Sequence, residues 1–269
     1  MADMDWWDRE DVRAVLKSFY NMLTPETRLI VVGRRYGELR FPTRNIDYVL
    51  DAFKPIRYIG YSLQGWSKEE DVLHKDPLSI EICFDLDNFP YAFDDMLTLT
   101  KWAREYGLSY VAYFTGSRGI RVSFGKAIVT SSGAVRSIGA LAAILRLRTV
   151  DLAPYLISNG WIQPAGTLHR KSGLPLFSFD EEDVKSYEDL FRIASEILKG
   201  SRNMIEPEIN KLNGDKLVEI VNEALDKLSE SQLTKIRQLI ERYVARAMRK
   251  YHIHVRYISS RYYESETYW

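Results

Sequence analysis

The sequence has a single cysteine, Cys83, and four histidines among its 269 residues. One cysteine excludes a disulfide framework and a cysteine-rich zinc site, so we expect no zinc. The histidines are too widely scattered for a histidine-rich metal site; they are His74, His169, His252 and His254.

Long hydrophobic runs and net charge are also missing. No run of about 18 apolar residues occurs, so we expect no transmembrane helix. The acidic and aromatic start, MADMDWWDRE, is unlike a signal peptide, and we expect a cytoplasmic protein with no membrane partner. The 37 basic and 37 acidic residues cancel, so only local clustering of charge could mark a nucleic-acid partner. The phosphate-binding motif GxxxxGKS/T is absent, which disfavours a P-loop ATPase.

The hydrophobic fraction of 46% is that of an ordinary globular chain, and its periodicity alternates between strand and helix spacing. We therefore predict an α+β fold. The predicted helices are 5–23, 46–53, 92–106 and 134–148, and the predicted strands are 28–32, 56–63, 79–87, 109–114 and 120–124. The pattern becomes helical after a linker at 200–208, with helices over 217–228 and 233–248. We predict a domain over 1–200 and a helical, basic region over 201–269.

Two carboxylates, Asp85 and Asp87, end the strand predicted at 79–87. Alternate residues of a strand face the same side, so both would project together. They repel each other unless a cation lies between them, and Mg²⁺ and Mn²⁺ prefer oxygen ligands. Two such ions can stabilise both the attacking and the leaving oxygens of a phosphoryl displacement. The alternative is a plain strand end, with Asp87 capping the turn that follows.

A second candidate segment is the turn TGSRGIR at 115–121, between two apolar strands. Its two glycines allow a tight turn whose backbone N–H groups can approach phosphate oxygens. Thr115 and Ser117 offer hydroxyl groups, and Arg118 and Arg121 offer charged, forked donors. The alternative is a hairpin turn with solvated arginines.

A third segment, 163–174, concentrates Gly, Thr, His, Arg and Lys in QPAGTLHRKSGL. Such a loop could hold the triphosphate of an incoming nucleotide, and Arg170 and Lys171, the neighbours of His169, favour that interpretation. The alternative is that His169 is structural or simply exposed.

These segments, in this order, resemble the small catalytic subunit of archaeal and eukaryotic primases. That family has a strand ending in DxD, matched by FDLD at 84–87, then a turn SGxRGxH, matched by TGSRGIR at 115–121. It then has a PxSLHxKSGL-like segment, matched by PAGTLHRKSGL at 164–174. The resemblance covers roughly residues 10–180. It implies a primase-type catalytic core with a mixed or antiparallel sheet containing an RRM-like unit, flanked by helices and followed by a helical C-terminal appendage.

The resemblance also implies site residues and cofactors. Asp85 and Asp87 would bind two Mg²⁺ or Mn²⁺ ions. The groups that would contact the triphosphate of an incoming nucleotide are Thr115, Ser117, Arg118, His169 and Lys171. Arg121 stands where the family has histidine, which keeps a phosphate-binding charge but changes its reach. Activity could be reduced as a result.

The third catalytic and metal-binding carboxylate would be Asp151, in the short stretch TVD, with Asp180 as the alternative. The zinc-binding insertion of cellular small subunits is absent. This points to a minimal version of the family, encoded in an archaeon or by a plasmid or virus.

Basic residues and tyrosines are interleaved from 235 onwards. Basic side chains follow phosphates and aromatic rings stack on unpaired bases, so we expect contact with a single-stranded DNA template or a partner subunit. The candidate residues are Arg242, Arg246, Arg249 and Lys250. The alternative is a helix with a solvated basic face.

The function predicted is that of a DNA primase or polymerase, a nucleotidyltransferase that makes or extends primers on single-stranded DNA from nucleoside triphosphates. Two alternatives remain: a weakened, primase-like accessory subunit of a replication protein, and a polymerase of end-joining repair. The sequence leaves open the preference for ribo- or deoxynucleotides, the ability to start a primer and the need for a large primase subunit.

Overall fold

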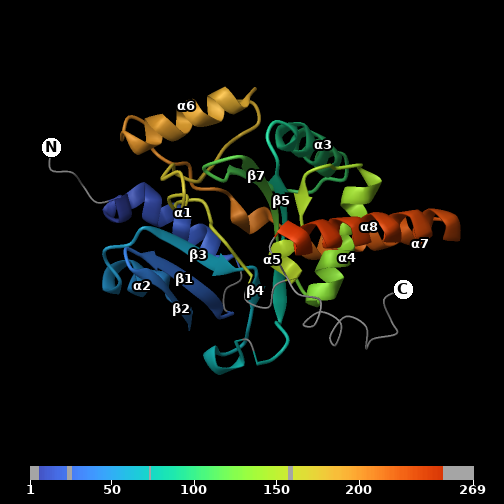
Figure 1. The fold of residues 1–269 in the computed structure, drawn as a ribbon, viewed down its shortest axis with the longest axis horizontal. Helices are drawn as coiled ribbons and strands as arrows, with labels where there is room; N and C mark the ends of the chain where they lie inside the picture. Colours follow the sequence, from blue (N-terminus) through green and yellow to red (C-terminus); the bar gives the residue numbers. More distant parts are fainter. Residues whose placement is uncertain (1–5, 23–25, 73, 157–159, 251–269) are drawn as a thin grey trace.

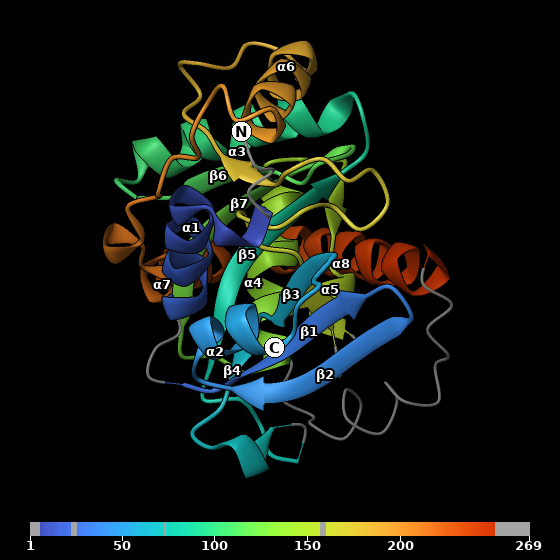
Figure 2. The same ribbon diagram turned by 90° about the vertical axis from the view of Figure 1, so that its left-hand side faces the viewer.

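The computed structural model describes residues 6–22, 26–72, 74–156 and 160–250. Two antiparallel sheets form the centre of the molecule, and helices cover them (Figures 1 and 2). This confirms the predicted α+β class. No helix within these described ranges is long and apolar enough to cross a membrane.

The first sheet has four strands in the order β2-β1-β3-β9. Their bounds are β1 (Arg28–Arg34), β2 (Gly37–Thr43), β3 (Tyr58–Ser62) and β9 (Trp161–Ile162). β1 runs two residues beyond its predicted end and returns through β2 in a hairpin, with Arg34 opposite Gly37. The sequence pattern did not predict β2, because only the last residue of this edge strand is buried and it lacks a continuous apolar face.

The second sheet carries the candidate site. Its strands follow the order β10-β6-β7-β5-β4, and β8 also pairs with β5. Their bounds are β4 (Gln64–Gly65), β5 (Ser79–Asp87), β6 (Val111–Phe114), β7 (Gly119–Ala127), β8 (Val150–Asp151) and β10 (Phe177–Ser178). The prediction for β5 is confirmed over its full length. β4 and β8 share one edge of β5, since β4 pairs with its start and β8 with its end.

Eight α-helices surround the sheets within the described residues. They are α1 (Glu10–Asn21), α2 (Ile46–Ala52), α3 (Tyr91–Glu105), α4 (Ser131–Ile144), α5 (Ala153–Leu156), α6 (Tyr187–Leu198), α7 (Gly214–Asp226) and α8 (Glu230–Lys250). Short 3₁₀ turns lie at Trp6–Asp8, Glu69–Asp71 and Ile209–Lys211. α3 and α7 contact β7, α4 contacts β5, and α7 and α8 pack on α4. Of the two C-terminal helices, α7 therefore lies against the second sheet itself, and α8 packs on α4.

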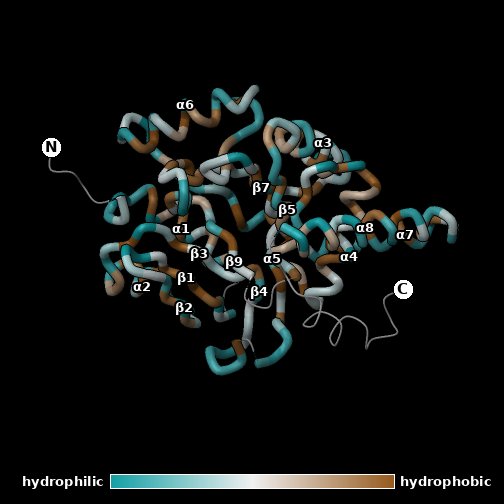
Figure 3. The backbone as a smooth tube through the Cα atoms, viewed as in Figure 1, coloured by the Kyte–Doolittle hydropathy of each residue, from teal (hydrophilic) through white to brown (hydrophobic). Residues whose placement is uncertain are grey.

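α6 was not predicted. It is amphipathic, and the tube in Figure 3 alternates between brown and teal along it. Leu190, Ile193 and Ile197 are buried on its inner side, and the side chain of Ser186 caps its start by accepting from Asp189 N–H.

The helix predicted at 134–148 begins and ends earlier in the sequence, as α4 (Ser131–Ile144). It starts at Ser131 because the Thr130 side chain accepts a hydrogen bond from Gly133 N–H. It ends at Ile144 because Arg146 adopts a positive φ of 56°, and Leu147 N–H then donates to the Ala142 carbonyl. This is a Schellman ending with an arginine in the position that usually takes glycine.

Two other helix ends are capped by residues close by in the sequence. Gly107 follows α3 with φ of 63°, as a C′ glycine does. At the start of α8, the Gln232 side chain accepts from Ser229 N–H at 2.9 Å, which is one half of a capping box. The boundary predicted between 1–200 and 201–269 stays a prediction; Leu217 and Leu225 of α7 belong to the same core cluster as residues of both sheets.

A buried ion pair joins the two sheets. Arg28 of β1 and Glu81 of β5 are both fully buried, with 3.3 Å between Nη2 and Oε2. The hydroxyl groups of Tyr61 and Ser123 also donate to Glu81, and the Arg28 guanidinium lies 4.0 Å from the centre of the Tyr61 ring. This network fixes β5, and with it the carboxylates at its end, relative to the first sheet.

Candidate active site

Three carboxylates converge where β5 meets β8. β8 runs antiparallel to β5, so Asp151 lies directly opposite Asp85 and Val150 opposite Leu86. Residues directly opposite each other project from the same face, as do Asp85 and Asp87 on one strand. The structure therefore places the predicted pair and the preferred third carboxylate on one face of the sheet.

Asp180 lies elsewhere. It follows β10, which pairs with β6 at the far edge of the sheet. β6 and β7 separate β10 from β5, and Asp180 itself is exposed. The structure thus brings Asp151, and not Asp180, beside Asp85.

Asp85 is held by Arg121, its direct neighbour on β7. Arg121 Nε donates to Asp85 Oδ1 at 2.8 Å and Nη2 donates to Oδ2 at 3.3 Å, while Nη1 donates to the Gln163 carbonyl at 2.7 Å. Both charged side chains are about nine-tenths buried, with 12% and 13% exposed. Burial raises the pKa of Asp85, and the charge of Arg121 and its hydrogen bonds oppose that shift.

Arg121 was predicted to contact phosphate. In the structure its guanidinium is directed at Asp85 and Gln163. A phosphate contact by Arg121 stays a prediction, and it would compete with this ion pair.

Asp87 and Asp151 face a different cation, the ammonium of Lys250 at the end of α8. Lys250 Nζ lies 2.5 Å from Asp87 Oδ2 and 2.7 Å from Asp151 Oδ2. Burial lowers the pKa of Lys250, but its hydrogen bonds to the two carboxylates more than offset this and raise it well above the usual range. The ammonium therefore bridges two carboxylates from different strands.

Within the described ranges, no group of three or more His, Cys, Asp or Glu side chains is arranged to hold a metal ion. Asp85 faces Arg121, whereas Asp87 and Asp151 face Lys250. Since the ammonium is a compact cation in contact with two carboxylate oxygens, it stands in for a bound ion. Asp87 and Asp151 thus fit one small cation, and their oxygens are the ligand type that Mg²⁺ and Mn²⁺ prefer.

A cavity of about 310 Å³ opens beside these carboxylates. Its lining residues are Asp87, Asn88, Arg118, Thr149, Val150, Asp151, Arg246, Ala247 and Lys250. This volume is at the lower end of the range of small-molecule sites. Arg118, predicted to contact triphosphate, therefore shares a cavity with two of the carboxylates.

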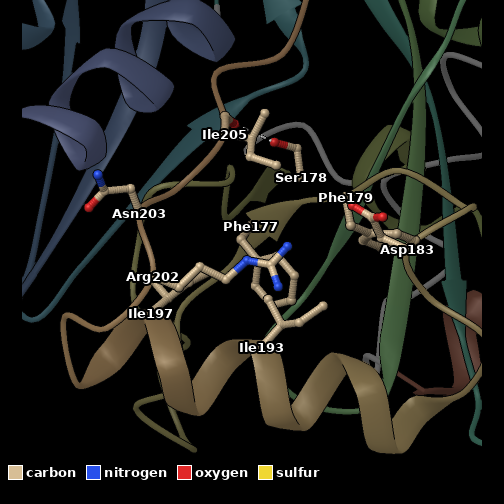
Figure 4. A pocket seen from close by; sticks show the side chains of 9 residues that line it. All are labelled: Phe177, Ser178, Phe179, Asp183, Ile193, Ile197, Arg202, Asn203 and Ile205. Atoms are coloured by element: carbon tan, nitrogen blue, oxygen red, sulfur yellow. Dashed lines mark hydrogen bonds between the residues drawn. The ribbon is translucent and has the colours of Figure 1, made fainter.

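A second cavity, shown in Figure 4, is much smaller than the one beside the carboxylates. It lies between β10, α6 and the segment that follows α6, and its volume of about 10 Å³ has room for roughly one water molecule. It is far too small for a nucleotide.

The turn between β6 and β7 is closed by Thr115. Its hydroxyl donates to the Gly119 carbonyl at 2.9 Å, and Gly119 N–H donates back to it at 3.2 Å. Thr115 is buried, Ser117 is partly exposed and Arg118 is exposed. The Thr115 hydroxyl is therefore used for hydrogen bonds within the turn. The contact with triphosphate predicted for Thr115 stays a prediction.

The turn lies against the loop at 169–174. The Ser172 hydroxyl donates to the Gly116 carbonyl at 2.6 Å, and His169 Nδ1 lies 2.9 Å from Ser172 Oγ. A Cβ at Gly116, where φ is 76°, would lie 2.6 Å from His169 Cβ, so only glycine allows this approach. Burial lowers the pKa of His169, with Arg121 and Lys171 adding to that shift. Lys171 itself is exposed.

The basic residues of α8 divide into two groups. Arg242 and Arg249 are exposed. Arg246 donates to the carbonyls of Arg148 and Val150, and Lys250 reaches the carboxylates. Residues 251–269, which contain further basic and tyrosine residues of the predicted nucleic-acid contact, lie outside the described residues.

Two roles escaped prediction from the sequence: the pairing of Arg121 with Asp85, and the position of Lys250 in the site. The first follows from strand register, which the sequence pattern does not specify. For the second, a signal was present, because residues 243, 246 and 250 have the spacing of one helix face.

No family model matches the chain, and no curated protein matches it by sequence. Solved structures do show similarity. The primase-polymerase domain of cyanophage S-2L is 12% identical with a TM-score of 0.42, over 68% of this chain and 97% of that one. The polymerase domain of ligase D from Mycobacterium tuberculosis, solved with DNA, is 12% identical with a TM-score of 0.43, over 71% and 88%. The catalytic domain of primase RepB′, solved with initiator DNA, is 10% identical with a TM-score of 0.40, over 72% and 97%. The similarity is one of fold, to primase and polymerase domains.

Proposed function

We propose that this chain is a nucleotidyltransferase of the DNA primase or polymerase type, which makes or extends primers on a single-stranded DNA template. One observation carries the proposal. Asp151 lies opposite Asp85 in the register of β5 and β8, beside Asp87, and the cavity at these carboxylates also contains Arg118. Anion-binding and cation-binding groups thus meet in one cavity, as phosphoryl transfer requires.

The roles of the residues follow from their positions. Asp87 and Asp151 would hold Mg²⁺ or Mn²⁺, which would polarise the phosphate and neutralise charge that develops during transfer. Arg118 would bind phosphate oxygens of the incoming nucleoside triphosphate. The loop with His169 and Lys171, which packs against the turn that carries Arg118, would bind the same triphosphate. The reaction is attack of a primer 3′-hydroxyl on the α-phosphate, with pyrophosphate as leaving group.

The test is nucleotide incorporation on a single-stranded template, primed and unprimed, with Mn²⁺ and each class of nucleoside triphosphate. We expect template-dependent products from the natural chain and a loss of about 100-fold or more in the Asp87→Asn, Asp151→Asn double variant. Asp226→Asn, which alters an exposed carboxylate at the end of α7, is the matched control and should retain full activity. A folded natural chain that makes no product under any of these conditions contradicts the proposal.

The ion pair between Arg121 and Asp85 favours the second candidate, a catalytically weakened accessory subunit, because it removes one carboxylate from the cation site. Binding of single-stranded DNA without metal-dependent nucleotide binding would support that candidate. A strong preference for 5′-phosphorylated gaps would instead indicate a polymerase of end-joining repair.

A further inference from the structure

The ammonium of Lys250 contacts both Asp87 and Asp151. We propose that Lys250 is a built-in counter-ion of the site, which a single divalent metal ion displaces when it binds. The last turn of α8 and the metal ion then compete for the same two carboxylates. This inference rests on the proposed function in taking the site to be a metal site.

The position of Lys250 is set by contacts along one face of α8. The Tyr243 hydroxyl donates to the Leu147 carbonyl at 2.7 Å, and Arg246 Nη1 donates to the Arg148 carbonyl at 2.6 Å. Together with Lys250, these residues are three and four positions apart and so lie on one face. They contact the segment from 147 to 151 in order along its length. The helix is thereby anchored on the strand that carries Asp151, which brings the ammonium to the site.

The charges at the site favour exchange for a divalent ion. The ammonium brings one positive charge to the two carboxylates of Asp87 and Asp151, whereas Mg²⁺ or Mn²⁺ brings two. The Lys250 side chain is 41% exposed, on a flexible four-carbon stem at the helix end, so it can leave without loss of core packing.

Arg121 has the opposite properties. It is 12% exposed, and three hydrogen bonds fix it to Asp85 and to the Gln163 carbonyl. Removing it would leave a buried carboxylate unpaired, which is costly. Asp85 therefore stays with Arg121, and the site takes one divalent ion in place of the two expected from the sequence.

The experiment is Mn²⁺ titration of the full chain, with free Mn²⁺ followed by electron paramagnetic resonance and heat by calorimetry. We expect one ion per chain. Lys250→Met keeps the length of the stem and removes the competing charge, so it should bind Mn²⁺ about tenfold more tightly. Arg249→Met removes one charge from the same helical turn without a contact to the carboxylates, and should change the affinity by about twofold at most. Two ions per chain, or equal affinity of Lys250→Met and the natural chain, would overturn the proposal.

A second measurement needs no variant. Acetylation of the Lys250 side chain in the natural chain, read by mass spectrometry, should quicken when Mn²⁺ is added, because the metal frees the ammonium from the two carboxylates. Acetylation that is unchanged at saturating Mn²⁺ would also overturn the proposal.

Both readouts are independent of activity. Single-ion binding with faster acetylation of Lys250 in a chain that makes no primer would refute the proposed function and leave this inference standing. Primer synthesis by the natural chain, together with equal Mn²⁺ affinity of the natural chain and Lys250→Met, would support the proposed function and overturn this inference.

Discussion

Arg121 and Asp85 face each other across β7 and β5, and the guanidinium donates two hydrogen bonds to the carboxylate, from Nε at 2.8 Å and from Nη2 at 3.3 Å. This relationship divides the three carboxylates of the site. Asp85 is paired and largely buried, whereas Asp87 and Asp151 share the partly exposed Lys250. A site with one fixed and one exchangeable cation follows from that division.

The pairing of Arg121 with Asp85 should contribute strongly to stability. Arg121→Ala leaves a buried carboxylate without its partner, so we expect the free energy of unfolding to fall by about 3–5 kcal/mol. Urea denaturation followed by circular dichroism measures this. The Arg121→Ala, Asp85→Ala double variant should lose much less than the sum of the two single variants. Additive losses would show that the two side chains do not interact.

The buried pair between Arg28 and Glu81 should join the two sheets in the same manner. Glu81→Gln leaves the fully buried Arg28 guanidinium uncompensated, and we expect a loss of about 3–5 kcal/mol in the free energy of unfolding. Replacing both by apolar residues, as in Arg28→Met with Glu81→Leu, should restore much of that loss. Glu105→Gln at the exposed end of α3 is the control, with an expected change within about 0.5 kcal/mol.

Stability should depend on pH through His169. Its pKa is lowered in the folded chain, first by burial and then by Arg121 and Lys171, so the unfolded chain binds the proton more readily. The stability that neutral His169 contributes is therefore present above its ordinary pKa of about 6.5 and is lost as the pH falls through the lowered value. Urea denaturation at several pH values should show a smaller loss on acidification in His169→Asn than in the natural chain. An identical pH profile in the two would contradict this assignment.

The exposed arginines of α8 should bind single-stranded DNA by charge. Arg242→Gln with Arg249→Gln should weaken binding and make the slope of log affinity against log salt shallower by roughly 0.7 for each phosphate that the variant no longer neutralises. Fluorescence anisotropy of a labelled oligonucleotide across a salt series measures both effects. Glu241→Gln, at the neighbouring exposed position, is the control, and its affinity should not fall. A double arginine variant with an unchanged salt slope would place the nucleic-acid interface elsewhere.

Strong local patterns allowed much of the fold to be predicted. The apolar run that ends in Asp85 and Asp87 predicted β5 correctly, and Gly107 marked the end of α3, because both signals are contained within a few neighbouring residues. The segments 115–121 and 163–174 were singled out for their composition. The structure brings them into contact through Ser172 and Gly116.

The features that escaped prediction depend on contacts between distant residues. β8 has only two residues, too few for a periodic pattern, and its place is set by pairing with β5. The partner of Arg121 depends on the register of β7 against β5. Lys250 reaches Asp87 across 163 positions in the sequence, through the packing of α8 on α4. Local sequence patterns do not contain this information.

The most direct test of the central claim compares the two candidates for the third carboxylate in a single-turnover incorporation assay with α-labelled nucleotide, primed template and Mn²⁺. Because Asp151 lies opposite Asp85 and Asp180 lies beyond β6, Asp151→Asn should lower the rate by about 100-fold or more, and Asp180→Asn should leave it within about twofold. A large loss in Asp180→Asn with an unaffected Asp151→Asn would contradict a catalytic site between β5 and β8.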